Sequence, residues 1–86
     1  MINKSIELQE MARVGMNQIE TSIIELLKRN PTGLSNQDID NELGLQSSHE
    51  GNQKNYLTYS ILGNLMEAGL VFKDKSGPRP KYKVID

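Results

Sequence analysis

The stretch LSNQDIDNELGL, residues 34–45, carries the start and stop signals of one short helix. Ser35 is a favourable N-cap, because its hydroxyl can accept a hydrogen bond from an otherwise unpaired backbone N–H of the first turn. Asp38 follows three residues later, where the helix dipole favours an acidic side chain. Gly44 supplies the left-handed residue with which many helices end. These signals predict a helix of about nine residues, which is too short to be stable without packing.

A longer helix is expected after this one, separated from it by a polar turn. Leu57, Ile61 and Leu65 follow one another at intervals of four, a spacing that places residues on the same side of a helix. Gly69 provides the stop signal. The pattern predicts a helix over residues 53–68 with those three apolar side chains facing the interior.

The C-terminal segment changes to the alternating period of β-strands. Residues 70–74 and 81–85 are predicted strands, and the six residues between them form a loop. Tyr82 and Val84 fall on one face of the second strand. A two-stranded ribbon is therefore expected at this end of the chain.

The N-terminal third contains one clear amphipathic helix and one ambiguous segment. Apolar residues recur at spacings of three and four over residues 16–29, and Pro31 disfavours continuation of that helix. Residues 1–15 follow a looser helical pattern, which Gly15 is expected to break. Two interpretations stay open for this segment: an extra helix that packs on a partner subunit, or a lightly docked terminus. We therefore divide the chain into this N-terminal segment and one domain spanning residues 16–86.

The order of the predicted elements defines the expected fold. Helix, short helix, turn, longer helix and two-stranded ribbon is the order of a winged helix-turn-helix domain. The predicted class is mainly α with a small β-hairpin: a three-helix core plus a wing, with the extra N-terminal helix as one of the two interpretations above. The chain has 86 residues, which suits one domain with one core.

The composition argues against catalysis and metal binding. The sequence contains no cysteine and a single histidine, His49, so one chain cannot build a thiolate or multi-histidine zinc site. It also lacks a phosphate-binding loop and a nucleophile elbow. No apolar run approaches the roughly 18–20 residues of a transmembrane helix, and the N-terminus lacks the apolar stretch of a secretory signal. We expect a cytoplasmic binding protein, not an enzyme, without metal or cofactor.

Charge is distributed unevenly along the chain. The net charge is −1, yet residues 1–50 carry four basic and eight acidic side chains, and residues 51–86 carry six basic and three acidic ones. Such an asymmetry can create an electropositive surface on a nearly neutral protein. Five basic residues, opposed only by Asp74, lie in and beside the predicted ribbon: Lys73, Lys75, Arg79, Lys81 and Lys83.

These cations allow two interpretations. A basic wing can lie along the DNA backbone, where neutralising phosphates releases counterions and makes binding depend on salt. Lysines on the edge of an exposed ribbon can instead keep the protein soluble.

The predicted third helix could read DNA. In a helix-turn-helix, the second helix of the pair enters the major groove and its early residues meet base edges. Asparagine can read adenine, lysine can reach guanine or phosphate, and threonine and tyrosine hydroxyls can bond to phosphates. With the apolar positions facing inward, the candidates on the outer face are Lys54, Asn55, Thr58 and Tyr59. The alternative is a solvated polar helix face.

The segment HEGNQKNYLTYSILGNLMEAGLV, residues 49–71, combines a polar turn, a tyrosine-bearing helix and a final Gly-Leu-Val. Together with LSNQDIDNELGL, it resembles winged-helix domains found in, or beside, bacterial restriction endonucleases, and the resemblance covers roughly residues 20–86. The chain departs from that group in lacking a nuclease domain and in its slightly acidic net charge. The resemblance implies DNA binding with a reading face made of Gln53, Lys54, Asn55, Thr58 and Tyr59.

We expect sequence-specific binding of double-stranded DNA, as a small transcriptional regulator or a recognition module. A homodimer through residues 1–30 is expected, because one small footprint rarely supplies enough specificity. The third helix would lie in the major groove and the basic wing on the backbone; the expected contacts are Ser35, Gln53, Lys54, Asn55, Thr58, Tyr59, Lys73, Lys75, Arg79, Lys81 and Lys83.

The alternative function is a protein–protein interaction module that does not bind DNA. Acids close to the third helix would repel phosphate and favour this alternative; the candidates are Asp38, Asp40 and Glu42.

Overall fold

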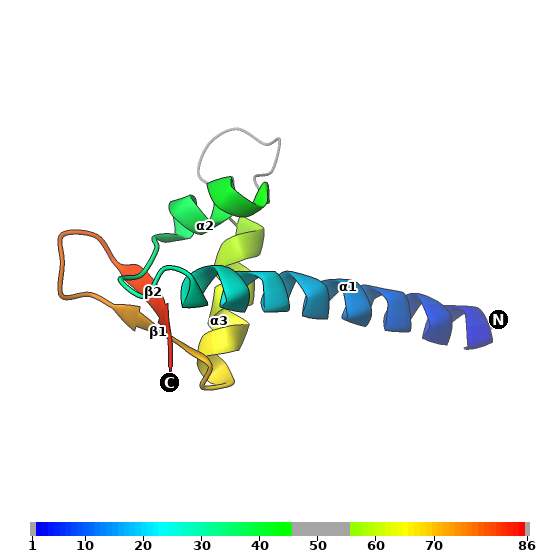
Figure 1. Ribbon diagram of the computed structural model, residues 1–86. Coiled ribbons are helices and arrows are strands. Elements are labelled where there is room, and N and C mark those ends of the chain that lie inside the picture. The colour runs from blue at the N-terminus through cyan, green and yellow to red at the C-terminus, as the bar shows by residue number, and fades with distance from the viewer. Residues whose placement is uncertain (1, 46–55, 86) are drawn as a thin grey trace.

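The computed structural model describes residues 2–45 and 56–85. These residues form three α-helices followed by a two-stranded antiparallel ribbon (Figure 1). The coarse class predicted from the sequence, mainly helical with a small β-hairpin, is therefore confirmed. In chain order the elements are α1 (Ile2–Lys28), α2 (Asn36–Leu43), α3 (Tyr56–Glu67), β1 (Val71–Asp74) and β2 (Lys81–Val84).

Helix α1 is one continuous helix of 27 residues, so the expected break at Gly15 is wrong. A glycine inside a helix costs only about 1 kcal/mol relative to alanine. No proline stands beside Gly15, and the helical pattern continues on both sides of it. The C-terminal half of α1 packs in the body of the molecule, whereas the N-terminal half projects away from it (Figure 1).

Helix α2 begins and ends where its capping residues predict. The backbone N–H of Asp38 donates to Ser35 Oγ at 3.1 Å, and the backbone N–H of Ser35 donates to Asp38 Oδ2 at 3.3 Å. This reciprocal capping box satisfies two donors at the start of the helix. Gly44 follows the last turn in the left-handed conformation, with φ 66°. The helix has 8 residues, one fewer than predicted.

All three helices and both strands contribute to one small core. Its central members are fully or almost fully buried and come from distant parts of the chain. They are Ile23 and Leu27 of α1, Ile39 of α2, Ile61, Leu62 and Leu65 of α3, Val71 of β1 and Tyr82 of β2.

The inward face of α3 differs from the one predicted. Leu57 is 42% exposed, whereas Thr58 is fully buried. Residues that step by four drift around a helix by about 40° per step, so a face that contains Ile61 and Leu65 takes in residue 58 and leaves residue 57 at its edge. The Thr58 hydroxyl is satisfied inside the protein, because it donates a hydrogen bond to Asp40 Oδ1. The predictions that Leu57 faces inward and that Thr58 lies on the outer face are wrong.

The segment before α2 pairs with the ribbon, a contact that the sequence did not predict. The backbone N–H of Leu34 donates to the carbonyl of Tyr82 at 3.2 Å, and the N–H of Tyr82 donates to the carbonyl of Leu34 at 2.7 Å. This two-bond bridge joins the start of α2 to β2. It therefore fixes the position of the α2 N-terminus beside the ribbon.

Candidate nucleic-acid interface

The two faces of the ribbon divide its basic residues. Lys73 is directly opposite Tyr82 in the antiparallel register, and Phe72 is directly opposite Lys83. Directly opposed residues project to the same face, and successive residues alternate. Lys73 therefore shares its face with buried Tyr82, while Lys81 and Lys83 project to the other face. The five basic residues do not form one continuous cationic surface.

Lys83 is engaged by an acid of its own ribbon. Its Nζ donates to Asp74 Oδ2 at 2.8 Å, and both side chains are about three-quarters buried. Ser76 donates to Asp74 Oδ1 through its backbone N–H at 2.9 Å and its hydroxyl at 2.6 Å. The hydrogen bond from Lys83, followed by those from Ser76, holds the pKa of the Asp74 carboxyl well below its usual range. These contacts anchor the ribbon loop and leave Lys83 little freedom to bind anything else.

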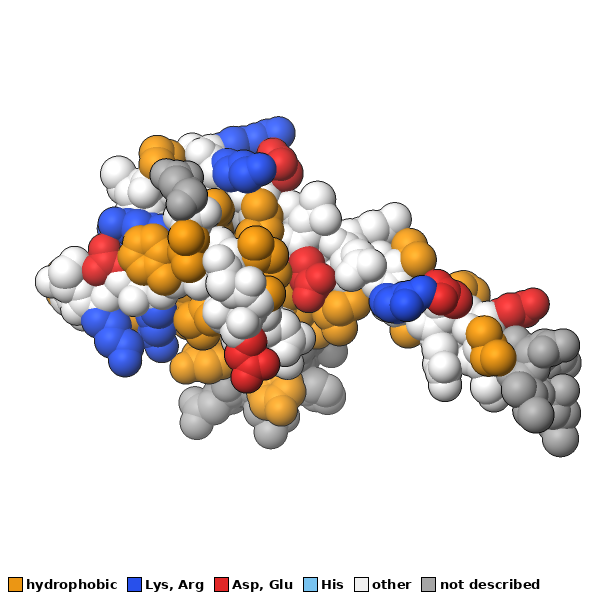
Figure 2. Space-filling model, turned by 90° about the horizontal axis from the view of Figure 1, so that it is seen from below, with side chains coloured by type: hydrophobic (Ala, Val, Ile, Leu, Met, Phe, Trp, Pro, Cys, Tyr) orange, Lys and Arg blue, Asp and Glu red, His pale blue; other side chains and the backbone are white. Residues whose placement is uncertain are grey.

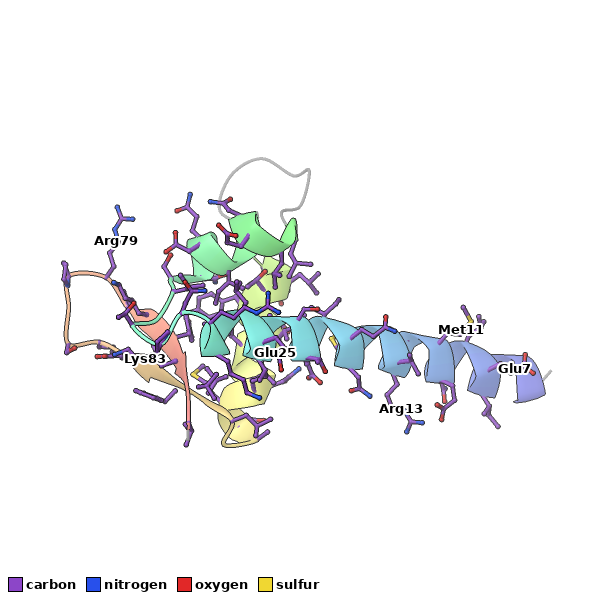
Figure 3. The ribbon with its side chains drawn as sticks, viewed as in Figure 1. Glu7, Met11, Arg13, Glu25, Arg79 and Lys83 are labelled. Carbon is purple, nitrogen blue, oxygen red and sulfur yellow. The ribbon has the colours of Figure 1, made fainter. Side chains whose placement is uncertain are left out.

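A groove of about 420 Å³ lies between the N-terminus of α2 and the ribbon. Helix α3 contributes the ring of Tyr59, and the ribbon contributes Lys73 and Arg79. The Arg79 side chain points to the side of the ribbon on which α2 lies (Figure 3). Among the described residues, no carboxylate lines this groove. We call it the α2–ribbon groove; its lining residues are Ser35, Asn36, Gln37, Tyr59, Lys73, Arg79, Pro80 and Tyr82.

Two aromatic rings hold the Lys73 ammonium in the groove. Lys73 Nζ lies 5.6 Å from the ring centroid of Tyr59 and 5.7 Å from that of Tyr82, within the range of cation–π attraction. Electrostatic interaction with Tyr82, and more weakly with Tyr59, raises the pKa of Lys73 above its ordinary value against the opposing effect of burial. Lys73 is therefore a positioned, fully charged cation at neutral pH.

The acids of α2 do not line this groove, although the Asp38 carboxylate accepts a hydrogen bond from the backbone N–H of the lining residue Ser35. Asp38 and Glu42 line a different hollow, together with Asn30 and Leu34. Asp40 does approach α3, but it is fully buried and accepts the hydrogen bond of Thr58. None of the three acids lines the α2–ribbon groove. Of the acids expected to repel phosphate, only Asp40 contacts α3, and its carboxylate is buried and not exposed to a ligand.

The structure brings together four of the predicted contact residues and separates others from them. Thr58 is inside the core, and Lys83 is paired with Asp74. Lys75 and Lys81 are exposed outside the groove, and no described carboxylate lies within 4.0 Å of their amino groups. The predictions for Gln53, Lys54 and Asn55 lie outside the described residues, as does His49. The four residues gathered in the groove are Ser35, Tyr59, Lys73 and Arg79.

Sequence reasoning missed the groove residues Asn36, Gln37 and Tyr82. Tyr82 was correctly expected on one face of its strand, but its role as a support for Lys73 depends on the cross-strand register. Asn36 and Gln37 reach the groove because Leu34 pairs with β2. Polar residues directly after the N-cap of a short helix were the only available signal.

The described part of the chain contains no cluster of three or more residues suited to hold a metal ion. Among its helices, none has the length and apolar character needed to cross a membrane. No protein-family model matches this sequence, and no curated protein matches it.

Proposed function

We propose that this chain is a winged helix-turn-helix domain that binds double-stranded DNA, as a small transcriptional regulator or a recognition module in the cytoplasm. In this proposal α2 and α3 are the helix-turn-helix pair, and the β1–β2 ribbon is the wing. The order of the elements, the buried contact between α2 and α3, and the pairing of Leu34 with β2 support this assignment.

The observation that carries the proposal is the chemistry of the α2–ribbon groove. Lys73 and Arg79 supply two positive charges to one concave surface, which no acid of residues 2–45 or 56–85 lines. Tyr59 and Gln37 add a hydroxyl and an amide that can bond to phosphate or sugar oxygens. A nearly neutral protein with a local cluster of this kind can still attract a polyanion.

The geometry suggests how each element would contribute. In the first turn of α2, the backbone N–H groups of Asn36 and Gln37 are outside the capping box and can bond to a phosphate. Arg79 can form two parallel hydrogen bonds to one phosphate, whereas Lys73 acts as a point charge. Helix α3 would then enter the major groove by its first turns, where Tyr56 and Tyr59 are 73% and 55% exposed. Gln53, Lys54 and Asn55 remain proposed base-reading residues at this end.

The proposal is tested by fluorescence anisotropy of a labelled duplex titrated with the full chain at several salt concentrations. Binding should weaken steeply with salt, because each phosphate contact releases counterions. Arg79→Gln and Lys73→Gln should each reduce the slope of log K against log salt by about 1. A chain that shows no salt-dependent binding to duplex DNA would contradict the proposal.

Lys28→Gln is the matched control. Lys28 is also an exposed lysine, but it lies at the C-terminal end of α1 and outside the groove. The salt slope of this variant should equal that of the wild type. An equal loss of slope in Lys28→Gln and Arg79→Gln would mean that the attraction is diffuse and not located in the groove.

A second candidate function is a protein-interaction module. Hydrophobic side chains gather on the underside of the body, between the ribbon end and the projecting half of α1 (Figure 2). Leu70, Phe72 and Ile85 are 43–49% exposed, and Phe72 and Ile85 border one hollow beside Leu27. Two results together would favour the protein-interaction function: no binding to duplex DNA, and loss of a protein contact in the variant Phe72→Ser.

A further inference from the structure

Half of α1 has no partner within its own domain. Residues 5–14 are all exposed, and together with residues 15 and 16 they form a projecting segment that we call the arm (Figures 1 and 2). Five apolar side chains of the arm are between 38% and 69% exposed: Ile6, Leu8, Met11, Val14 and Met16. A segment with this much apolar surface is typical of a contact region.

One side of the arm continues the buried side of α1. Leu8, Ala12 and Met16 follow one another at intervals of four, and their line leads to the core residues Ile19 and Ile23. At about 100° per residue, these five positions fall within one quarter to one third of the helix circumference. The arm carries its charges outside this stripe, at Glu7, Glu10 and Arg13. Figure 3 shows Arg13 and Met11 on opposite sides of the helix.

The body offers a second apolar contact beside the arm. Tyr59 faces the ribbon, with its ring near Lys73. Leu57 precedes Tyr59 by two residues, about 200° around the helix, so its 42% exposed side chain lies on the other flank of α3. Figure 1 shows the ribbon on one side of α3 and the arm on the other. Leu57 is therefore an exposed apolar side chain on the flank of α3 that faces away from the ribbon.

We propose that the stripe binds the arm of a second copy, paired antiparallel about a two-fold axis at Ala12. Leu8 and Met16 both stand four residues from Ala12, so Leu8 of one copy lies level with Met16 of the other. The small side chain of Ala12 lets the two backbones approach closely at the crossing point. The sequence predicted a dimer interface within residues 1–30. We restrict this proposed interface to the arm, because Ile23 and Leu27 are buried in the domain's own core.

The position of the body decides between antiparallel and parallel pairing. In a parallel pair the pairing side would run on into residues 19–27. There the α2 and α3 of each copy already cover it, so the two bodies would occupy the same space. In an antiparallel pair the bodies lie at opposite ends, which also gives the closed, self-complementary interface of a symmetric dimer.

A second copy fits the stripe better than the other occupants do. Leu8, Ala12 and Met16 offer no cation for a phosphate or an acidic membrane surface. A two-fold axis at Ala12 matches the stripe to itself without requiring any other partner. The pairing does not depend on DNA binding, so either proposal can fail alone.

Cysteine cross-linking tests the pairing directly, because the natural chain has no cysteine. Ala12→Cys should form a disulfide-linked dimer under mild oxidation with copper phenanthroline. Leu8→Cys should not, since two equivalent residues at position 8 would stand roughly 12 Å apart along the pair, beyond the reach of a disulfide. A mixture of Leu8→Cys and Met16→Cys should again cross-link.

Self-linking of Leu8→Cys as fast as that of Ala12→Cys would overturn the antiparallel arrangement. Sedimentation equilibrium of the wild-type chain provides the second measurement. We expect twice the chain mass of 9.7 kDa; a wild type that stays monomeric at about 100 µM would overturn the dimer.

Matched arm variants separate the stripe from the rest of the helix. Ala12→Glu should raise the dimer dissociation constant at least tenfold, because it places a charge on the two-fold axis. Val14→Glu introduces the same acid about 200° around the helix from Ala12. This variant should change the dimer dissociation constant less than twofold. If the two variants changed the dissociation constant equally, the proposal that this stripe is the dimer interface would be wrong. Residues 5–16 lie outside the core, so the amide NMR spectrum should show a folded body in both variants. Titration of the Ala12→Glu monomer with duplex DNA then measures DNA binding independently of dimerisation.

Discussion

The hydroxyl of Thr58 on α3 donates a hydrogen bond to the carboxylate of Asp40 on α2, and both side chains are fully buried. This polar contact joins the two helices inside an otherwise apolar core. The other carboxylate oxygen, Asp40 Oδ2, is also buried and has no hydrogen-bond partner among the described residues. The Asp40 carboxylate therefore depends on Thr58 for its one described hydrogen bond.

Replacing Thr58 with valine tests this relationship. Valine keeps the shape of the side chain and removes the donor, so a buried carboxylate loses its described partner. We expect Thr58→Val to lower the free energy of unfolding by about 1–3 kcal/mol, measured by urea denaturation at neutral pH. Ser60→Ala removes a hydroxyl from an exposed position of the same helix and should change stability by less than about 0.5 kcal/mol. Equal stabilities of wild type and Thr58→Val would show that the hydrogen bond contributes nothing.

The same pair explains an error in the sequence-based prediction. Apolar periodicity assigns leucine to the interior and threonine to the surface, and positions 57 and 58 are adjacent. The 3.6-residue period puts residue 58 on the face of Ile61 and Leu65, and Asp40 presents from another helix the acceptor that satisfies the buried threonine. The local sequence pattern does not contain that acceptor. The capping residues predicted the ends of α2 correctly, because Ser35, Asp38 and Gly44 act on backbone groups within a few residues of themselves.

The Asp74–Lys83 pair predicts a pH dependence. The folded-state pKa of Asp74 is lowered, so its contribution to stability is fully present above the unfolded pKa of about 3.9 and is lost as pH falls towards the folded value. In Lys83→Gln the Asp74 pKa should rise towards its ordinary value, as measured by NMR titration of the side-chain carboxyl. Wild type should be the more stable protein at neutral pH, and the difference should shrink below about pH 4.

Lys75→Gln serves as the control for that titration. Lys75 is an exposed lysine next to Asp74 in the chain, but Lys83 supplies the hydrogen bond. An Asp74 pKa that rises equally in both variants would mean that general positive charge, and not the Lys83 contact, lowers it.

Gly33 marks a close approach of the backbone to β2. Its φ is +95°, and an added Cβ would lie 2.9 Å from Lys81 Cβ and 3.1 Å from Lys83 Cγ. Gly33→Ala should therefore destabilise the domain by about 1–3 kcal/mol, measured by thermal or urea unfolding. Gly63→Ala is the contrasting variant, because a Cβ there meets nothing within 4 Å inside α3; it should stabilise by roughly 1 kcal/mol. A neutral Gly33→Ala would contradict the close packing of this turn on the ribbon.

The candidate interface could be predicted only in part, for a physical reason. Ser35, Tyr59, Lys73 and Arg79 were predicted by residue type, because cations and hydroxyls on exposed elements suit a polyanion. Their assembly into one groove depends on the Leu34–Tyr82 bridge and on the ribbon register. Those are long-range contacts that local pattern does not contain.

The most direct test of DNA binding by the groove is an NMR titration of the isotope-labelled chain with duplex DNA, read residue by residue. We predict that the largest amide shifts fall at residues 35–37, at Tyr59, and at Lys73 and Arg79, and that added salt reverses them. Shifts confined to the arm or to the surface around Phe72 and Ile85, or no shifts at low salt, would contradict the account.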